Sequence, residues 1–438
     1  MNRKVGVNSR DVFAFSYTWL QITFVSYEAK VFLYLSTFNL LNKIIGGKIK
    51  MKKLFKLMSL VLMLVSVFAL ASCGGSDSDT IKLGSAGPLS GSVSIYGQAV
   101  KKGVELAIEE INNAGGVDVN GVKKQLELVD FINDEADPNK AGTALTTLIS
   151  KDVDVVVGAV TSGATEGLIS EAVKYGVPVI TPTGTADKLT IGANGDERDT
   201  RANIFRACFY DSYQGTYMAN YAKTAGYDKA YVLYNNDDDY SVGLKDAFVK
   251  TAEDAGLTVV AQGYGKDVKD FTTYWAPITA GGYQCVYVPD YYENVYNILT
   301  TGYSNGYNGV CYGGDGWDGV IQQVKAGDDA SFLENCFYTN HYFGKSENEV
   351  VKAFVEKFEA KYGETPVSFA ALAYDAVYIA KQAIEKAGTT DYAKVVEALT
   401  NGTFTGLVTS SKPFSFSDGN PVKDATVITF KDGKEVEA

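Results

Sequence analysis

Short apolar runs alternate with amphipathic segments along most of residues 81–438 of this 438-residue chain. Residues 96–113 carry apolar side chains at helical spacing and stop at Gly115-Gly116, whereas the Val-rich run 153–158 is continuous, as in a buried strand. The same contrast predicts strands at 81–84, 126–131, 178–181, 230–234, 258–263, 285–288, 309–312 and 337–340, and helices at 138–150, 166–175, 213–225, 242–255, 293–301, 347–362 and 370–387.

Strands that alternate with helices of this length predict βαβ units, and therefore parallel sheets covered by helices on both faces. The series breaks near residues 208–211. We therefore expect an α/β protein with two lobes, each built around its own sheet.

The residues that follow the strands predict a binding cleft, because ligands of open α/β sheets lie beyond the carboxyl ends of the strands. Glycines and small hydroxyl residues dominate the earlier ends, and tyrosines and carboxylates dominate the later ones. Such a cleft offers neutral donors to an anion on one wall and an acid to a cation on the other. A small zwitterion fits it. The segments are 87–91, 159–163 and 182–185, then 235–240, 289–292 and 313–316.

The charge of the chain argues against a nucleic-acid partner. Residues 1–72 contain ten basic and two acidic residues, so the remaining 30 basic and 50 acidic residues give the rest of the chain a net charge of −20. A region with this much negative charge repels the phosphate backbone of a nucleic acid. A single histidine, His341, also argues against His-based catalysis and multi-His metal sites, and we expect no catalytic residue, metal or cofactor.

Residues 51–73 have the architecture of a secretory signal. Three lysines precede an uncharged, mostly apolar run at 57–71, which is shorter than the ~20 residues of a membrane-spanning helix. The ending LASC resembles a bacterial lipobox, which implies that 51–72 is a lipoprotein signal peptide and that Cys73 carries the lipid. The alternative is an ordinary export signal with an incidental cysteine. Residues 73–80 then form the lipidated cysteine and a flexible polar tether.

Residues 1–50 precede a signal that should itself begin the protein. We interpret them as translated upstream DNA, with the native start at Met51. The alternative is an additional membrane-associated leader. Residues 1–50 in peptide maps of the unprocessed precursor would refute the first interpretation.

A series of motifs from about residue 81 to 433 resembles the leucine/isoleucine/valine-binding proteins of ABC importers, which have the type I periplasmic binding fold. The motifs occur in the order of that family and are GPLSG at 87–91 with YG at 96–97, INNAGGV at 111–117, DEADP at 134–138, TPTGT at 181–185, DSYQG at 211–215, GGDGWD at 313–318 and FAALAYDAV at 369–377. The resemblance implies two Rossmann-like lobes joined by three crossovers. The expected N-terminal lobe is 81–208 with 341–408, and the expected C-terminal lobe is 209–340 with 409–438.

The resemblance also implies which residues bind the ligand. Ser162, Thr183 and Thr185 match positions that hold an α-carboxylate, helped by the N-terminus of the helix expected at 166–175. Asp315 matches the carboxylate that receives the α-ammonium. The matching aromatic residues, which close over the ligand, are Tyr96, Tyr240 and Tyr291.

Three departures from the family pattern bear on the ligand. Asp315 stands where Glu is usual, Asp290 stands where Gly is common, and Thr161 replaces a cysteine that some relatives pair with another. The first departure shortens the acid that binds the ammonium, and the second adds another acid beside Tyr291. Both weaken the prediction of a branched aliphatic amino acid and leave open a ligand with a polar or cationic side chain, or a short amide.

Other motifs have plainer interpretations. The glycines of 314–319 satisfy G-x-G-x-x-G, but Asp315 would face the phosphates of a dinucleotide. The acidic run 237–239 lacks EF-hand spacing and reads as a solvated turn. His341 reads as a structural residue at a crossover. We expect the remaining cysteines, Cys208, Cys285, Cys311 and Cys336, to be buried thiols, with Cys311–Cys336 as one possible pair.

The most direct hypothesis is a non-enzymatic, monomeric lipoprotein on the outer face of the bacterial membrane, which captures an amino acid and delivers it to an ABC permease. Its partners are then the amino acid, the permease and, through the lipid on Cys73, the membrane. A sensory domain that presents its ligand to a receptor is the alternative. A secreted hydrolase is a third reading, but a nucleophile with an activating histidine is not evident.

Overall fold

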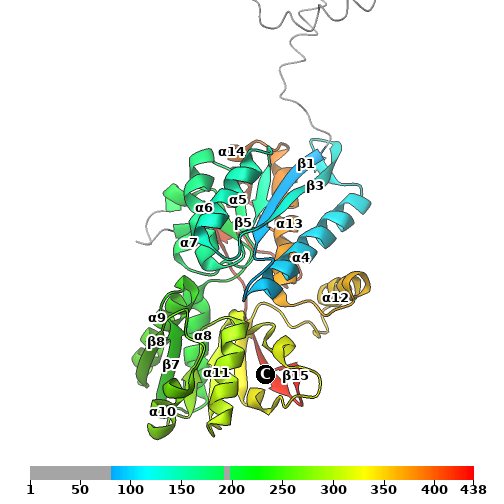
Figure 1. The fold of residues 1–438 in the computed structure, drawn as a ribbon. Coiled ribbons are helices and arrows are strands. Elements are labelled where there is room, and N and C mark those ends of the chain that lie inside the picture. Colours follow the sequence, from blue (N-terminus) through cyan, green and yellow to red (C-terminus); the bar gives the residue numbers. More distant parts are fainter. Residues whose placement is uncertain (1–79, 192–197) are drawn as a thin grey trace, which may run out of the picture. The chain divides into compact units, whose positions relative to one another are not determined.

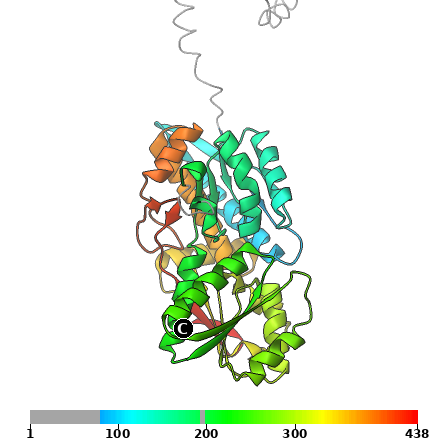
Figure 2. The same cartoon turned by 90° about the vertical axis from the view of Figure 1, so that its left-hand side faces the viewer.

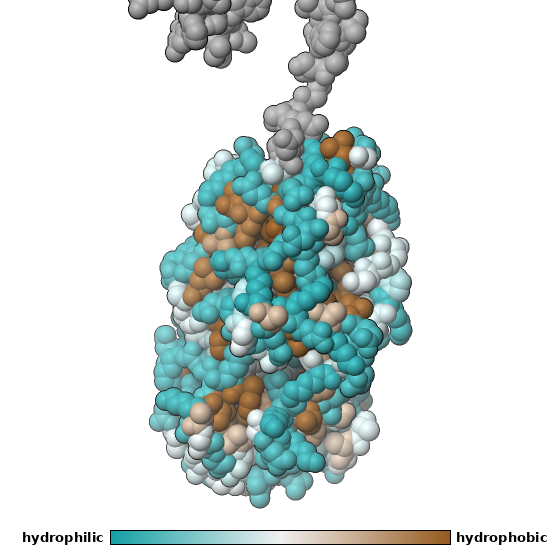
Figure 3. Space-filling view, turned by 90° about the vertical axis from the view of Figure 1, so that its right-hand side faces the viewer, coloured by the Kyte–Doolittle hydropathy of each residue, from teal (hydrophilic) through white to brown (hydrophobic). Residues whose placement is uncertain are grey.

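The computed structural model describes residues 80–191 and 198–438. The expected leader, Cys73 and most of the tether therefore lie outside the described residues. From Ser78 onward the chain is one compact unit built around two large sheets (Figures 1 and 2). On the face drawn in Figure 3, hydrophilic residues predominate and apolar residues form separate groups. In the described part, no helix has both the length and the apolar character needed to cross a membrane.

The first sheet runs in the order β2 (Val117–Val119), β3 (Val122–Asn133), β1 (Thr80–Gly87), β4 (Val155–Val157), β5 (Val179–Thr181) and β6 (Ile204–Arg206). All pairs are parallel except β2–β3. Helix α4 (Ser94–Asn113) packs with α13 (Ser368–Ala387), and α5 (Pro138–Ile149) packs with α6 (Ser162–Tyr175). Val155 and Val157 share a buried cluster with the first helix pair, and Val156 shares one with the second. Since alternate side chains of a strand point to opposite faces, helices cover both faces of this sheet.

The second sheet runs in the order β15 (Lys434–Glu437), β14 (Thr426–Lys431), β11 (Cys336–Asn340), β10 (Val310–Gly313), β9 (Cys285–Tyr287), β7 (Lys229–Asn235) and β8 (Thr258–Tyr264). It is parallel from β11 to β8 and antiparallel at β14 and β15. Val232 packs with α8 (Asp211–Thr224) and α9 (Asp239–Asp254), and Leu233 packs with α10 (Thr272–Ala280) and α11 (Tyr292–Ser304). Both faces of this sheet are therefore covered as well.

The chain passes between the two sheets three times, at residues 207–210, 341–348 and 422–425. The second crossover leads into α12 (Glu349–Tyr362), whose Lys357 pairs with Glu110 of α4 at 2.8 Å. The two-lobed α/β fold with three crossovers is confirmed.

The segment before the last crossover packs against the first lobe, although we expected residues 409–421 in the second. Strands β12 (Phe416–Ser417) and β13 (Asn420–Pro421) form a small hairpin beside β6. The N–H of Arg206 donates to the carbonyl of Gly419 at 3.1 Å, and the ring of Phe416 lies 5.1 Å from that of Phe205. Two-residue strands carry no periodic signal, so the sequence pattern did not indicate this placement. The other lobe boundaries stay predictions.

Short or polar elements account for most other differences from the expected pattern. Helix α6 begins at Ser162 rather than at 166, because the side chain of Thr161 caps it by accepting from the N–H of Ala164 at 3.4 Å. Strands β2 and β6 are short and contain the charged residues Asp118 and Arg206, and α10 contains Pro277, so the sequence pattern did not indicate these three elements. The remaining elements are α7 (Lys188–Ile191), α14 (Tyr392–Thr400), η2 (Arg198–Arg201), η3 (Asp315–Trp317), η4 (Val320–Gln323) and η5 (Ser331–Leu333).

Candidate functional site

The carboxyl ends of strands from both sheets meet at one small cavity. It is lined by Val160, Thr161, Ser162, Thr183, Thr185, Tyr240, Tyr291, Asp315, Gly316 and Phe369. Six of the seven residues expected to bind the ligand are in this set. The structure therefore brings the expected hydroxyl residues and the expected acid to opposite sides of the same space.

Tyr96, the seventh expected residue, lies beside the cavity rather than on its wall. Its ring stacks on that of Phe369 with centroids 3.9 Å apart. Its hydroxyl donates to the carbonyl of Gly316 and accepts from the N–H of Tyr292 at 3.3 Å. Since α4 belongs to the first lobe and Gly316 to the second, Tyr96 ties the two lobes together at the edge of the cavity.

The hydroxyl wall is built from the first turn of α6 and the loop after β5. The Ser162 Oγ accepts from the N–H groups of Thr185 and Ala186 at 3.2 and 3.1 Å. The Thr183 hydroxyl donates to the carbonyl of Val160 at 2.6 Å. These bonds fix the two segments to each other. The Ser162 proton stays available to a ligand, as do the N–H groups at the start of α6 that have no helical partner.

Arg206 supports this wall from behind, a role that no sequence pattern indicates. The side chain is fully buried at the end of β6 and donates to the carbonyls of Gly184 at 3.1 Å, Thr185 at 2.6 Å and Ala186 at 2.9 Å. Burial lowers the pKa of the guanidinium from its ordinary value, which still leaves it charged. The loop is thus held by a cation that lies behind the neutral groups facing the cavity.

Asp315 forms the opposite wall and is held by three neutral donors. Its Oδ1 accepts from Gln214 Nε2 at 3.0 Å and from the Tyr240 hydroxyl at 2.9 Å, and its Oδ2 faces His341 Nε2 at 3.0 Å. Gln214 is itself fixed, since its Oε1 accepts from the N–H of Asp315 at 3.1 Å and from the Thr339 hydroxyl at 3.0 Å. The carboxylate is buried, and neither a lysine nor an arginine is among these partners.

Tyrosine rings cover the cavity from the second lobe. Tyr240 and Tyr291 stack with centroids 4.8 Å apart, and Tyr96 meets Tyr291 edge to face at 5.9 Å. Burial raises the pKa of the Tyr240 and Tyr291 hydroxyls well above their ordinary value, so both are neutral. Among the described residues, the buried Tyr291 hydroxyl has no hydrogen-bond partner.

Asp290 does not add a second acid to the cavity. It is buried, but its carboxylate accepts from the N–H of Tyr291 at 2.6 Å, from Asn294 Nδ2 at 3.1 Å and from the Tyr264 hydroxyl, and it is absent from the cavity wall. Burial raises its pKa to about 6. This removes one of the two sequence features that favoured a polar or cationic ligand side chain.

The remaining motifs are structural. The N–H of Gly316 in the G-x-G-x-x-G segment donates to the Tyr240 hydroxyl at 2.7 Å, so the loop does not offer this group to a phosphate. Asp238 caps α9 by accepting from the N–H of Ser241 at 3.1 Å, and Asp239 pairs with Lys188 of α7 at 2.8 Å. In residues 80–191 and 198–438 we find no group of three or more residues that could hold a metal ion.

The four cysteines of the described part are free and buried. Cys311 and Cys336 lie directly opposite each other on parallel strands β10 and β11. The expectation of buried thiols is confirmed, and the possible Cys311–Cys336 disulfide is not formed.

Comparison with known proteins agrees with this geometry and confirms the resemblance seen in the sequence. Residues 80–435 match the family described as periplasmic binding protein. A leucine-, isoleucine-, valine-, threonine- and alanine-binding protein of Pseudomonas aeruginosa is 32% identical over 331 residues, which are 74% of this chain and 83% of that protein.

Two solved structures are similar over 82% of this chain. The branched-chain amino acid transporter substrate-binding protein LivJ of Streptococcus pneumoniae, in complex with isoleucine, is 31% identical, with a TM-score of 0.72 and 100% of that chain covered. The leucine-binding protein LivK of Thermotoga maritima is 27% identical, with a TM-score of 0.73 and 97% of that chain covered. These relatives are binding proteins, and the matched stretch contains both sheets and the whole cavity. The chain belongs to the periplasmic binding protein family.

Proposed function

We propose that this protein binds one free amino acid with an apolar side chain in the cavity between its lobes and delivers it to the permease of an ABC importer. The observation that carries the proposal is the position of Asp315 across one cavity from Ser162, Thr183 and Thr185. The amino-acid-binding relatives support the same reading.

The hydroxyl wall suits an α-carboxylate. The start of α6 supplies backbone N–H groups and a partial positive charge, and Ser162 supplies a hydroxyl proton. The buried Arg206 adds a positive potential without forming an ion pair that would hold the ligand too firmly. A carboxylate therefore replaces its water shell with several donors that are already in place.

The opposite wall suits an α-ammonium. A carboxylate offers about four lone-pair sites, and Gln214, Tyr240 and His341 occupy three of those on Asp315. The fourth, on Oδ2, is left for a ligand. Because closure excludes water, the attraction between this carboxylate and an ammonium is stronger than at a surface.

The rest of the wall suits an uncharged side chain. Val160 and Phe369 supply apolar surface to the cavity. Asp290 is engaged elsewhere, so a cationic side chain would be buried without a partner. We therefore favour branched-chain and similar neutral amino acids over basic ones.

The location and anchoring of the protein follow from its N-terminal sequence. We propose that Cys73 is lipidated, that the protein stands outside the cytoplasmic membrane on its polar tether, and that it acts as a monomer. Mass spectrometry of the mature N-terminus tests the lipid directly. Cys73→Ala should release the protein from the membrane fraction, and a Cys73→Ala protein that stays in that fraction would contradict the anchor.

A thermal-shift screen of the twenty amino acids, followed by calorimetry, tests the binding function. A ligand at about 1,000 times its Kd adds roughly 4 kcal/mol to the free energy of unfolding, which a melting curve resolves. We expect a shift with L-isoleucine or a close relative, and none with L-lysine or with the matching deaminated acid. A shift with the deaminated acid equal to that with the amino acid would contradict the role of Asp315.

Transport and sensing are separated by uptake rather than by binding. Deleting the gene should reduce uptake of the radiolabelled amino acid if the protein feeds a permease. Unchanged uptake, together with loss of a response to that amino acid, would instead favour the sensory alternative.

A further inference from the structure

His341 is the only histidine of the chain, and it lies at the start of the second crossover. Its side chain has no exposed surface. The ring stacks on Phe209 of the first crossover with centroids 3.7 Å apart, and its Nε2 faces Asp315 Oδ2 at 3.0 Å. The imidazole thus connects two crossovers to the acid of the ligand cavity.

The chemistry of this contact fixes the proton. A carboxylate only accepts, so Nε2 carries the hydrogen and Nδ1 keeps its lone pair. Among the described residues Nδ1 is buried and has no hydrogen-bond partner. Burial lowers the pKa of His341, while Asp315 raises it and Lys423 of the last crossover lowers it. The imidazole is therefore neutral at neutral pH and brings no positive charge to Asp315.

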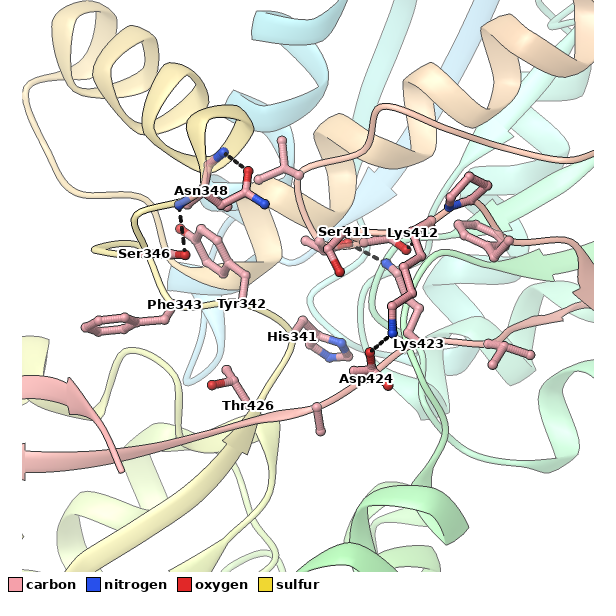
Figure 4. Close-up of a pocket in the computed structure, with 18 of the residues that line it drawn as sticks. His341, Tyr342, Phe343, Ser346, Asn348, Ser411, Lys412, Lys423, Asp424 and Thr426 are labelled. Atoms are coloured by element: carbon pink, nitrogen blue, oxygen red, sulfur yellow. Dashed lines mark hydrogen bonds and ion pairs between the residues drawn. The ribbon is translucent and has the colours of Figure 1, made fainter.

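A larger hollow of about 480 Å³ is lined by residues of the second and third crossovers (Figure 4). His341 lines it, as do Lys423 and Asp424. The Lys423 ammonium donates to the carbonyl of Ala207 at 2.6 Å and to the Thr409 hydroxyl. Lys423 is therefore fixed to the first crossover, and its charge opposes a positive charge on the His341 ring.

We propose that His341 is a positioning residue: its Nε2–H orients Asp315 toward the ammonium of the ligand, and its neutral state sets the pH range in which the amino acid is held. The inference rests on the proposed function, because it assigns the ammonium to Asp315. A protonated imidazole would neutralise Asp315 and repel the ammonium. Acidification thus releases the ligand, and ligand binding makes His341 harder to protonate.

The single histidine makes the proton directly observable. We would label the full protein, purified with a tag free of histidine, with ¹⁵N-histidine and follow its two ring nitrogens by NMR between pH 4 and 8. We expect the Nε2–H tautomer at pH 7, a pKa below the ordinary ~6.5 and a further fall on adding L-isoleucine. The Nδ1–H tautomer, or an ordinary pKa that L-isoleucine leaves unchanged, would overturn the proposal.

Three variants separate positioning from packing. His341→Phe keeps the stack on Phe209 but loses the donor, and should weaken L-isoleucine binding about ten- to a hundredfold. His341→Gln can supply an N–H without a titrating ring, and should recover part of the affinity while losing its pH dependence. As the matched control, Phe209→Leu removes the stack, and should lower the Tm without changing the pH profile.

The dependence of the Kd on pH tests whether the protonation of His341 controls ligand binding. In the wild-type protein, the Kd for L-isoleucine should rise by up to about tenfold per pH unit below the pKa of His341. The same profile in wild type and His341→Gln would overturn the proposal. If the wild-type protein binds none of the twenty amino acids, the proposed function fails, and the NMR tautomer still decides separately whether His341 donates to Asp315.

Discussion

Replacing Asp315 by Asn tests the ammonium site with the smallest change of shape. The substitution removes one negative charge and keeps the volume of a side chain that is 1% exposed. Its Oδ1 can still accept from Gln214 and Tyr240, whereas its new N–H₂ group faces His341 Nε2, 3.0 Å away in the wild type. The imidazole can resolve that conflict by moving its proton to Nδ1, so the fold should survive.

The effect on binding should be large. Loss of one partner of a buried charge pair costs about 2–5 kcal/mol, which corresponds to a Kd roughly 30 to 4,000 times higher at 1.4 kcal/mol per tenfold. The deaminated acid has no ammonium, so its weak binding should not fall further. Isothermal titration calorimetry at pH 7, with circular dichroism as a check of folding, measures both.

Asp290→Asn is the matched control, since Asp290 is an equally buried acid of the same lobe whose carboxylate is held by Tyr264, Tyr291 and Asn294 outside the cavity. It should change the Kd by less than about threefold. A folded Asp315→Asn protein that binds as tightly as wild type, or an Asp290→Asn protein that loses as much affinity, would refute the reasoning.

Three further substitutions test the surroundings of the cavity. Ser162→Ala leaves two buried N–H groups without their acceptor and should lower both affinity and the free energy of unfolding by about 1–3 kcal/mol; an unchanged Tm would contradict the bonds described. Arg206→Lys loses the forked donors to three carbonyls of one loop and should lower the Tm and weaken amino-acid binding, as calorimetry would show; wild-type values for both would be contrary to its supporting role. The raised pKa of Asp290, about 6, means that the native state binds a proton at this group more readily than the unfolded chain, so the contribution of Asp290 to stability should fall by up to about 3 kcal/mol as the pH rises from 4 to 6 and stay constant above. Asp290→Asn should flatten that part of a urea-denaturation profile, and an identical slope in both proteins would count against it.

The fold could be predicted from the sequence because its signals are local and repeated. The central strands β4, β5 and β9 are buried on both faces and appear as continuous apolar runs, and the long helices α4 and α13 each have an apolar stripe. The rule that ligands lie beyond strand ends then selected the segments that contain Ser162, Thr183, Tyr291 and Asp315, and the resemblance to the family singled out these residues. Strand β6 contains the charged Arg206 and strand β12 has only two residues, so neither forms an apolar run that this pattern could identify.

The residues that hold the cavity wall in place could not be predicted, because they lie far in the chain from the residues that they contact. Gln214 lies 101 positions from Asp315 and comes from α8, and His341 comes from a crossover 26 positions away. Arg206 is a buried cation in a strand, where composition predicts an exposed one. The single histidine was conspicuous, but only the structure shows that it touches the acid rather than filling space.

A crystal structure with the amino acid selected by the thermal-shift screen tests the central claim most directly. The ligand carboxylate should lie within about 2.7–3.2 Å of donors from Ser162 and the first turn of α6, and its ammonium within the same range of Asp315 Oδ2. A ligand bound in the opposite orientation, or outside the cavity lined by Thr185 and Asp315, would contradict it.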